Sequence, residues 1–509
     1  MPKFTYSVGS SKEIVEVDFN LSILDVMQDL DLDISFPCNG RHSCGKCKVI
    51  AFGELSPMNE VEHRMLGDQA PQNMRLACFA KILGDVEIIL PESERDDQIA
   101  QRFSIMMQTL DPSYDGDYGF AVDIGTTTIV AYLFVKDSLW ALAYDGHRNL
   151  QQRFGADVLS RIDYANRNGV ESLTKSIRAQ LSELFLELCD TAHVSTDKIS
   201  KAVIAGNSVM LHLLAGLEPR TLAEAPFDMV SEFGEYMDWR IDGFPQMEIY
   251  LPRCMAAYIG ADITCSMLAA DLDNLDDGTC LVDIGTNGEM ALKADGKLLC
   301  CSTAAGPAFE GAGISSGMSA KPGAISKVWA QNGSMHYEVI ADIKPSGVCG
   351  SGLIDAVSVA IELGIINKQG RIVLDDGQDF EIGDSGVKLT QKDIRQLQMA
   401  KAAIRAGIDT MLEMRGIDTK DLKELILCGG FGSYLDPKSA AGIGMIPLEL
   451  SDKSKAIGNG AGAGASMILQ DRSMEAESIR IAEKSEIVEL SYSKSFSSKY
   501  INAMSFPVK

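Results

Sequence analysis

The N-terminal part of the chain alternates apolar and polar positions in short runs. Strands are expected at residues 1–17, 46–55 and 84–90. Between the first two, residues 21–30 carry apolar positions at helical spacing, and Asn20 or Ser22 is placed to cap this helix. Pro91 follows the last strand and closes a unit that mixes short strands with one helix.

Two apolar blocks about 160 residues apart share one pattern. FAVDIGTTTIVAYLF at 120–134 and CLVDIGTNGEMALKA at 280–294 each hold an apolar strand, an aspartate, a Gly-Thr turn and a returning strand. Repetition at this interval predicts two related α/β lobes, because a solenoid would repeat every few tens of residues. Residues 93–117 combine acidic, amphipathic and Gly- and Pro-containing stretches, which predicts a linker element.

Helical patterns follow these blocks, and the clearest covers residues 390–415. Thr390 and Asp393 form a T-x-x-D cap at its start, and apolar residues then repeat at helical spacing. Further along, residues 458–466 consist entirely of Gly, Ala, Asn and Ser, which predicts a helix that packs closely against a neighbour.

Composition and charge narrow the class of protein. The chain has 509 residues, 46% of them hydrophobic and 23% charged, which is typical of a globular protein with several domains. The net charge of -25 repels phosphate backbones and anionic lipids, so we expect no nucleic-acid or membrane partner and favour one with a basic docking face. The sequence contains neither a long apolar run nor a leader pattern, and a cytoplasmic location is therefore expected.

Four of the twelve cysteines are clustered. Cys38, Cys44 and Cys47 form C-x5-C-x2-C, and 30 residues separate them from Cys78. In a reducing compartment such clusters are more often metal ligands than disulfides, and glycines in this loop let backbone N–H groups approach the sulfurs. The alternatives are a structural zinc site or buried cysteines that bind no metal. A zinc ribbon, however, pairs two C-x2-C knuckles, and this chain has one.

The cysteine cluster resembles that of plant-type ferredoxins, with C-G-K-C at its centre and R-L-A-C around the fourth cysteine. The first gap is one residue longer than in those proteins. The resemblance implies a β-grasp domain in which Cys38, Cys44, Cys47 and Cys78 bind a 2Fe-2S cluster. We assign no role to the remaining cysteines.

The two Asp-led turns are candidate phosphate loops, because the chain has no P-loop sequence. Backbone N–H groups and hydroxyls of such a turn can face a phosphate, while Asp123 can hold Mg²⁺ through water. The second loop, from Asp283 to Glu289, can grip the same triphosphate from the other side. The candidate ligands are Gly125, Thr126, Thr127 and Thr128 in the first turn and Gly285, Thr286, Asn287 and Gly288 in the second. The alternative for either turn alone is a hairpin that binds nothing.

A third candidate loop lies within residues 425–435, where an apolar strand runs into a glycine-rich turn. The turn consists of Gly429, Gly430, Phe431 and Gly432. With so few side chains, it offers a surface against which an adenine can lie flat. A glycine-rich turn without a ligand is the alternative.

The order of these segments resembles the superfamily of sugar kinases, heat-shock chaperones and actin. The order is phosphate loop, connecting segment, second phosphate loop, adenosine loop and second connecting helix. The resemblance implies a two-lobed actin-like (ribonuclease H-like) ATPase fold that closes on ATP. The expected fold class is therefore α/β and α+β multidomain, with a β-grasp ferredoxin domain followed by the actin-like ATPase fold.

Five further segments make the resemblance more specific. They are GNSVMLHLLAGLEP (206–219), YIGADI (258–263), STAAGPAFEGAGISSGM (302–318), GVCGSGLID (347–355) and LCGGFGSYLD (427–436). With the ferredoxin-like start, they resemble the reductive activators of corrinoid proteins over nearly the whole chain. The resemblance implies an ATPase with a 2Fe-2S cluster and Mg²⁺ that returns a Co(II) corrinoid, carried by a methyltransferase-system protein, to Co(I). It also implies a low-potential electron donor, and it is compatible with a homodimer.

The resemblance also suggests domain boundaries. They are a 2Fe-2S ferredoxin-like domain at 1–92, the linker element at 93–117, a first ATPase lobe at 118–278, a second lobe at 279–470 and a segment completing the ATPase domain at 471–509.

For hydrolysis we expect Asp123 and Asp283 to organise Mg²⁺ and the attacking water. Glu289 is a candidate base, and the alternative is a solvated strand residue. Three other functions remain open: an activator of a radical dehydratase, a small-molecule kinase with a redox domain, and a redox-sensing nucleotide switch. A kinase would phosphorylate a small molecule, whereas an activator releases ADP and free phosphate.

Overall fold

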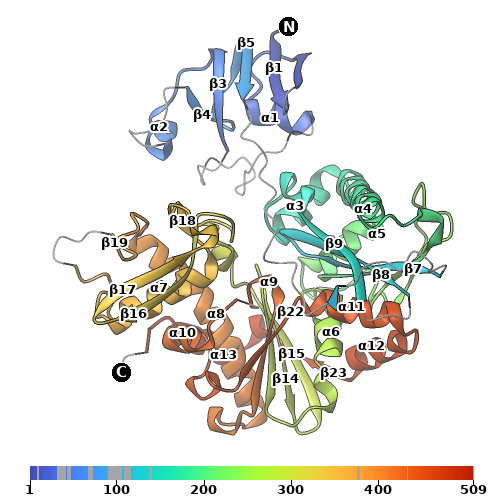
Figure 1. Cartoon of the computed structure of the whole chain (residues 1–509), viewed down its shortest axis with the longest axis vertical. Helices are drawn as coiled ribbons and strands as arrows, with labels where there is room; N and C mark the ends of the chain where they lie inside the picture. The colour runs from blue at the N-terminus through green and yellow to red at the C-terminus, as the bar shows by residue number, and fades with distance from the viewer. Residues whose placement is uncertain are drawn as a thin grey trace. The chain divides into compact units, whose positions relative to one another are not determined.

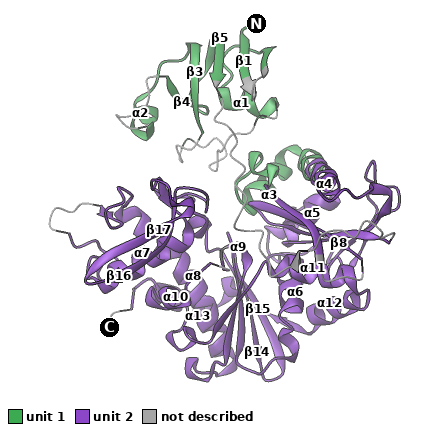
Figure 2. Ribbon diagram, in the orientation of Figure 1, with its two compact units in different colours: residues 1–95, 149–177 green, residues 96–148, 178–509 purple. Residues whose placement is uncertain are grey.

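The computed structural model describes residues 1–8, 11–30, 32, 42, 47–66, 73–89, 106–107, 116–136, 140–374, 379–432 and 434–507. The chain divides into two compact units, one of residues 1–95 with 149–177 and one of residues 96–148 with 178–509 (Figure 2). Within these described ranges, no helix is both long enough and apolar enough to cross a membrane.

The first unit contains a five-stranded mixed sheet with strand order β2-β1-β5-β3-β4 (Figure 1). Its strands are β1 (Lys3–Val8), β2 (Ser11–Glu16), β3 (Lys48–Leu55), β4 (Met74–Leu76) and β5 (Ile82–Ile89). Strand β1 pairs antiparallel with β2 and parallel with β5, and the apolar side of helix α1 (Ile23–Asp29) is buried in the same core. This confirms the predicted β-grasp arrangement.

Two details of the first unit differ from or sharpen the sequence prediction. The single strand expected over residues 1–17 is a pair, β1 and β2, because Gly9 and Ser10 interrupt the apolar alternation. Of the two predicted caps, Ser22 is the N-cap of α1: its hydroxyl accepts from the N–H of Asp25, whose carboxylate accepts from the N–H of Ser22. The other helices of this unit are α2 (Glu60–Leu66), η1 (Leu150–Arg153), α3 (Val158–Asn168) and the start of α4 (Glu171–Ala192).

The second unit contains two large sheets with strand orders β11-β12-β10-β7-β8-β9-β6 and β22-β21-β13-β14-β15-β23. The first sheet has β6 (Met106–Met107), β7 (Tyr118–Ile124), β8 (Thr128–Val135), β9 (Trp140–Arg148), β10 (Ile199–Gly206), β11 (Glu235–Met237) and β12 (Glu248–Leu251). The second has β13 (Thr279–Ile284), β14 (Gly288–Ala294), β15 (Lys297–Thr303), β21 (Glu424–Cys428), β22 (Ser454–Gly458) and β23 (Ser485–Ile487). Most of the predicted linker element and its amphipathic stretch lie outside the described residues.

The two sheets share one topology. In the first, β7, β8 and β9 run antiparallel and β10 joins β7 in parallel. In the second, β13, β14 and β15 run antiparallel and β21 joins β13 in parallel. The two Asp-led blocks are therefore corresponding hairpins, and the predicted pair of related α/β lobes is confirmed.

Helices α6 (Ala261–Ala269) and α11 (Gly460–Gln470) pack against one another between the two sheets (Figure 1). A Cβ on Gly464 would lie 2.1 Å from the carbonyl oxygen of Cys265, and one on Gly460 would lie 2.7 Å from the hydroxyl of Ser266. Only glycine fits at such distances. The small residues of the predicted 458–466 segment thus allow the close packing that the sequence indicated.

The remaining helices cover the sheets or build a smaller layer with β16 (Ala324–Gln331), β17 (Ser334–Val339) and β18 (Gly347–Val348). They are α5 (Ser208–Ala215), α7 (Gly350–Glu362), α8 (Gln391–Arg415), α9 (Gly429–Gly432), α10 (Pro437–Gly442), α12 (Ser473–Lys484) and α13 (Lys494–Ala503). Short elements are β19 (Phe380–Glu381), β20 (Lys388–Leu389), η2 (Thr196–Lys198), η3 (Arg220–Leu222), η4 (Leu272–Asn274), η5 (Pro307–Glu310), η6 (Ile340–Asp342), η7 (Thr419–Asp421), η8 (Leu448–Leu450) and η9 (Leu490–Tyr492). The predicted capping box of Thr390 and Asp393 starts α8, as expected.

Candidate functional site

Three aspartates meet where the lobes of the second unit converge. Asp123 lies near the end of β7, Asp283 near the end of β13, and Asp262 in the first turn of α6. Burial, followed by the negative charges of Asp262 and Asp283, raises the pKa of Asp123 from 3.8 to about 8. Burial and Asp283 raise the pKa of Asp262 to about 7. Carboxylates in this arrangement favour a shared proton or a hard cation such as Mg²⁺.

The sequence prediction included Asp123 and Asp283 but not Asp262. Asp262 was visible in the YIGADI segment, but it lies outside both hairpins. Gly260 forms the N-cap of α6, and a Cβ on it would lie 2.5 Å from the Cα of Asn207. This close approach of two loops orients the first turn of α6, and only the tertiary packing makes it visible.

Glu289 is buried in β14, directly across the strand pair from Asp283. Burial, followed by the charges of Asp262 and Asp283, raises its pKa well above the usual range. The alternative of a solvated strand residue is therefore wrong, because the side chain faces into the lobe and not into solvent. Its role as a base remains a prediction.

The carboxylates predict a pH-dependent stability, because a raised pKa means that the folded protein keeps a proton that the unfolded chain has lost. For Asp123 this window runs from 3.8 to about 8, so the free energy of unfolding falls as pH rises, by at most about 1.4 kcal/mol per pH unit per proton. Without divalent cation and nucleotide, thermal unfolding should occur at lower temperature at pH 8 than at pH 5. Asp123→Asn should flatten this decline, and an equally steep decline in the variant would contradict the assignment.

The hydroxyls of the two candidate phosphate loops converge on a single carboxylate. Thr127 Oγ1 donates to Glu310 Oε2 at 2.8 Å, and Thr286 Oγ1 donates to Glu310 Oε1 at 2.7 Å. The two hydroxyl oxygens are 3.4 Å apart. Glu310, the last residue of η5, lies within the 302–318 segment but was not predicted as a site residue, because nothing local to it indicates a phosphate loop.

The other residues of the two turns define similar loops. The N–H of Gly125 donates to the carbonyl of Thr128 at 2.9 Å, and the N–H of Gly285 donates to the carbonyl of Asn287 at 3.0 Å. Each hydrogen bond closes a tight turn between a strand that has an aspartate as its penultimate residue and the strand that returns from it. Gly288 begins the second returning strand. Thr126 differs from Thr127, since its buried hydroxyl accepts a hydrogen bond from Asn207 Nδ2 at 3.2 Å.

The glycine-rich turn after β21 lies beside the carboxylates. Gly429 has φ +87°, which favours glycine, and a Cβ on it would lie 2.4 Å from Asp283 Oδ1. The backbone of Gly430, Phe431 and Gly432 continues this turn as α9, and the side chain of Phe431 lies outside the described residues. The turn is next to the second phosphate loop because β21 and β13 are parallel and end at one edge. Adenine binding here remains a prediction.

In the first unit, Cys47 and Cys78 lie together and are both buried. Cys47 precedes β3 and Cys78 follows β4, and the antiparallel pairing of Lys48 with Leu76 brings their Sγ atoms to 3.3 Å. The hydrogen bond between the two thiols is the main cause that lowers the pKa of Cys47 to about 7. Two converging thiols, one of low pKa, suit thiolate ligation of iron. Cys38 and Cys44 lie outside the described residues.

A buried ion pair fixes the segment that carries Cys78. The guanidinium of Arg75 in β4 donates to both carboxylate oxygens of Glu62 in α2, each at 2.9 Å. The N–H of Leu76 also donates to Glu62, at 2.9 Å. A bidentate pair of this kind is geometrically restrictive, so α2 holds the strand that leads into Cys78.

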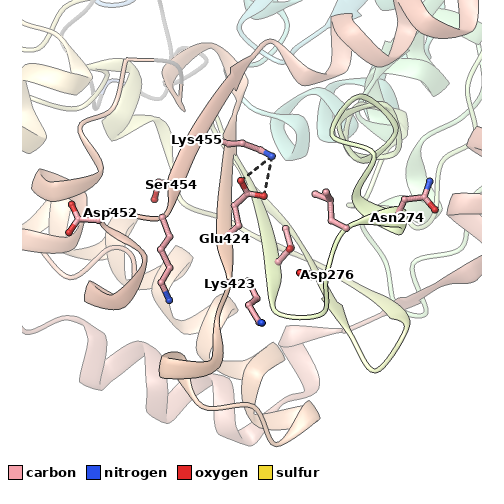
Figure 3. Close-up of a pocket in the computed structure, with 10 residues that line it drawn as sticks. Asn274, Asp276, Lys423, Glu424, Asp452, Ser454 and Lys455 are labelled. Carbon is pink, nitrogen blue, oxygen red and sulfur yellow. Dashed lines mark hydrogen bonds and ion pairs between the residues drawn. The ribbon is translucent and has the colours of Figure 1, made fainter.

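A groove of about 660 Å³ in the second unit is separate from the predicted nucleotide loops of that unit (Figure 3). Thr279, Glu424 and Ser454 line it, and each is the first residue of its strand, β13, β21 or β22. The Asp-led turn and the glycine-rich turn follow the opposite ends of the same strands. The groove therefore lies at the far end of the sheet from the predicted nucleotide loops, and its Lys455 is paired with Glu424.

Comparison with known families and proteins gives consistent matches. Residues 7–83 match the 2Fe-2S iron-sulfur cluster binding domain, residues 118–275 the RACo middle region, and residues 277–509 the C-terminal domain of RACo, the ASKHA domain. The chain is 38% identical over 384 residues to the corrinoid activation enzyme RamQ of Eubacterium limosum, covering 69% of this chain and spanning 64% of the length of that relative.

Two further proteins are similar over more of their own length. The chain is 29% identical over 435 residues to a Co(II) methylated amine-specific corrinoid protein reductase of Methanosarcina barkeri, covering 76% of this chain and 77% of that protein. A solved structure of a reductive activator for corrinoid, iron-sulfur protein matches with a TM-score of 0.70 and 28% identity, covering 100% of this chain and 99% of the other. The predicted ferredoxin and actin-like folds are thus confirmed.

Proposed function

Because the chain belongs to the RACo family, we propose that it is an ATP-dependent reductive activator. Its substrate is a corrinoid protein of a methyltransferase system, whose cobalt it returns from Co(II) to Co(I) by transfer of one electron. The observation that carries the proposal is the meeting of the two Asp-led loops in a chain that also has the buried pair of Cys47 and Cys78.

The residues of the second unit suit a magnesium nucleotide. Asp123, Asp262 and Asp283 would hold Mg²⁺, in part through water, since hard cations prefer carboxylate oxygens. The two phosphate loops would bind the phosphates with backbone N–H groups and with the hydroxyls of Thr127 and Thr286. The turn that begins at Gly429 would receive the adenosine. Hydrolysis then gives ADP and free phosphate.

The first unit would hold the redox centre. Cys38, Cys44, Cys47 and Cys78 would bind a 2Fe-2S cluster, which supplies one-electron transfer when bound. The protein would work in the cytoplasm with a low-potential electron donor, and its acidic surface favours docking partners with a basic face. A homodimer is compatible with this proposal.

The requirement for ATP follows from the redox step, because Co(I) is difficult to reach from Co(II). Each ~59 mV of uphill one-electron transfer costs about 1.4 kcal/mol. ATP can supply this only if it binds two conformations of the protein unequally. The two lobes, which meet at Thr127 and Thr286, provide an element whose closure depends on the nucleotide.

The test is an anaerobic reduction assay with the full chain after iron-sulfur reconstitution. Purified corrinoid protein in the Co(II) state is mixed with the chain and titanium(III) citrate, and the visible band of Co(I) is followed. We expect Co(I) to form with Mg²⁺ and ATP but not with ADP or without nucleotide. Equal formation of Co(I) without nucleotide, or a protein without colour after reconstitution, would overturn the proposal.

A further inference from the structure

Glu310 occupies the place where the two phosphate loops meet. It ends the short helix η5, and its two carboxylate oxygens accept from hydroxyls of different lobes, Thr127 at 2.8 Å and Thr286 at 2.7 Å. A hydroxyl has one proton to donate, so both donors are used by this carboxylate. The Glu310 carboxylate therefore bridges the two loops.

A carboxylate in this position resembles a bound phosphate in its chemistry. Both are anions whose oxygens accept hydrogen bonds, and the Thr127 and Thr286 hydroxyls are the donors that the proposed function gives to the nucleotide. A phosphate oxygen can accept hydrogen bonds from these two hydroxyls only after the Glu310 carboxylate has moved away from them. Two anions cannot share the place, because at short range their charges repel.

The backbone around Glu310 is built to turn sharply on both sides. Gly306 before η5 has φ +81° and Gly311 after it has φ +77°, and both values favour glycine. The N–H of Gly306 also donates to the carbonyl of Thr286 at 2.9 Å, which ties the start of η5 to the second loop. Further along, the N–H and hydroxyl of Ser315 donate to Asp393 Oδ1 at 2.8 and 3.1 Å. Glu310 thus lies on a short segment fixed at both ends.

We propose that Glu310 is an internal competitor of the terminal phosphate of ATP, which must displace the carboxylate from Thr127 and Thr286. This inference rests on the proposed function and adds a regulation of its nucleotide site. ADP, which lacks the terminal phosphate, leaves the bridge in place. Because η5 packs against α7 and α8, displacement of Glu310 makes the position of this segment depend on whether ATP or ADP is bound.

The test is the affinity of Glu310→Gln for ATP and ADP, measured by isothermal titration calorimetry with Mg²⁺ on the full chain. The amide keeps the size of the side chain but removes the competing charge. We expect the Kd for ATP to fall about tenfold and the Kd for ADP to change by less than about threefold. Glu310→Asp keeps the charge but is too short to reach both hydroxyls, so we expect its Kd for ATP to lie between those of wild type and Glu310→Gln.

Glu424→Gln is the matched control, since it removes one negative charge from the groove at the far end of the sheet. We expect it to bind both nucleotides like the wild type. Unchanged or weaker ATP binding in folded Glu310→Gln would overturn the role of Glu310, as would equal tightening of ATP and ADP. If Glu310→Gln does not fold, wild-type affinity in Glu310→Asp would overturn it. A wild-type protein that binds neither nucleotide would instead overturn the proposed function.

Discussion

Asp123→Asn is expected to lower the rate of ATP hydrolysis at least about 100-fold while the visible spectrum of the reconstituted protein stays the same. The side chain lies among the carboxylates of Asp262 and Asp283, and burial, followed by the charges of these two groups, raises its pKa. In the proposed magnesium site, Asp123 would be ionised and would contribute a full negative charge to the cation. Asparagine keeps the shape of the side chain but not this charge, so both the cation and the attacking water lose an oriented partner.

The measurement is phosphate release under saturating Mg²⁺ and ATP, with the visible spectrum recorded on the same sample. Asp452→Asn is the matched control, because Asp452 carries the same charge but lies in the exposed groove of Figure 3. It should hydrolyse ATP like the wild type. If Asp123→Asn retains ATPase activity, Asp123 has no role in hydrolysis, whatever the result for the cluster.

Cys47→Ala or Cys78→Ala should abolish reduction of the corrinoid protein. ATP hydrolysis, measured without the corrinoid protein, should be retained. The two thiols are buried and 3.3 Å apart, and the pKa of Cys47 is lowered to about 7, so they fit adjacent ligands of one cluster. A 2Fe-2S cluster that loses one of four thiolates is not expected to survive purification. The loss should be visible as a loss of colour after anaerobic reconstitution and as iron content near zero.

Cys189→Ala is the control for this pair. Cys189 is also buried, but burial raises the pKa of its thiol to about 12, which is the behaviour of an ordinary core cysteine. We expect this variant to keep its iron, its colour and its ATP-dependent reduction of cobalt. Retention of a full 2Fe-2S spectrum by Cys78→Ala would exclude Cys78 as a ligand and would reopen the alternative of a different metal site.

Much of the fold follows from features that are local in the chain. The alternation of β7 and β8, the returning strand after each Asp-led turn and the cap of α8 depend on residues only a few positions apart. Such features are set by backbone geometry and side-chain pattern, and a sequence displays them directly. Cys47 and Cys78 are further apart in the chain, but a single antiparallel pairing of two strands is enough to bring them together.

The site itself depends on contacts between distant segments. Glu289 looks like an exposed strand residue in the sequence, yet the lobe buries it opposite Asp283. Asp262 joins the aspartates only because α6 packs between the two sheets.

The sequence by itself therefore determined the two folds, the order of the loops and the family, since these are written in short motifs and in their repetition. Only the tertiary structure decided which charged and polar side chains lie next to one another in the candidate site. Thr127 and Glu310 are 183 positions apart, and no local pattern encodes their hydrogen bond. That contact exists because the two lobes pack around a buried cluster that contains residues of both sheets, and this packing brings together groups that are distant in the chain.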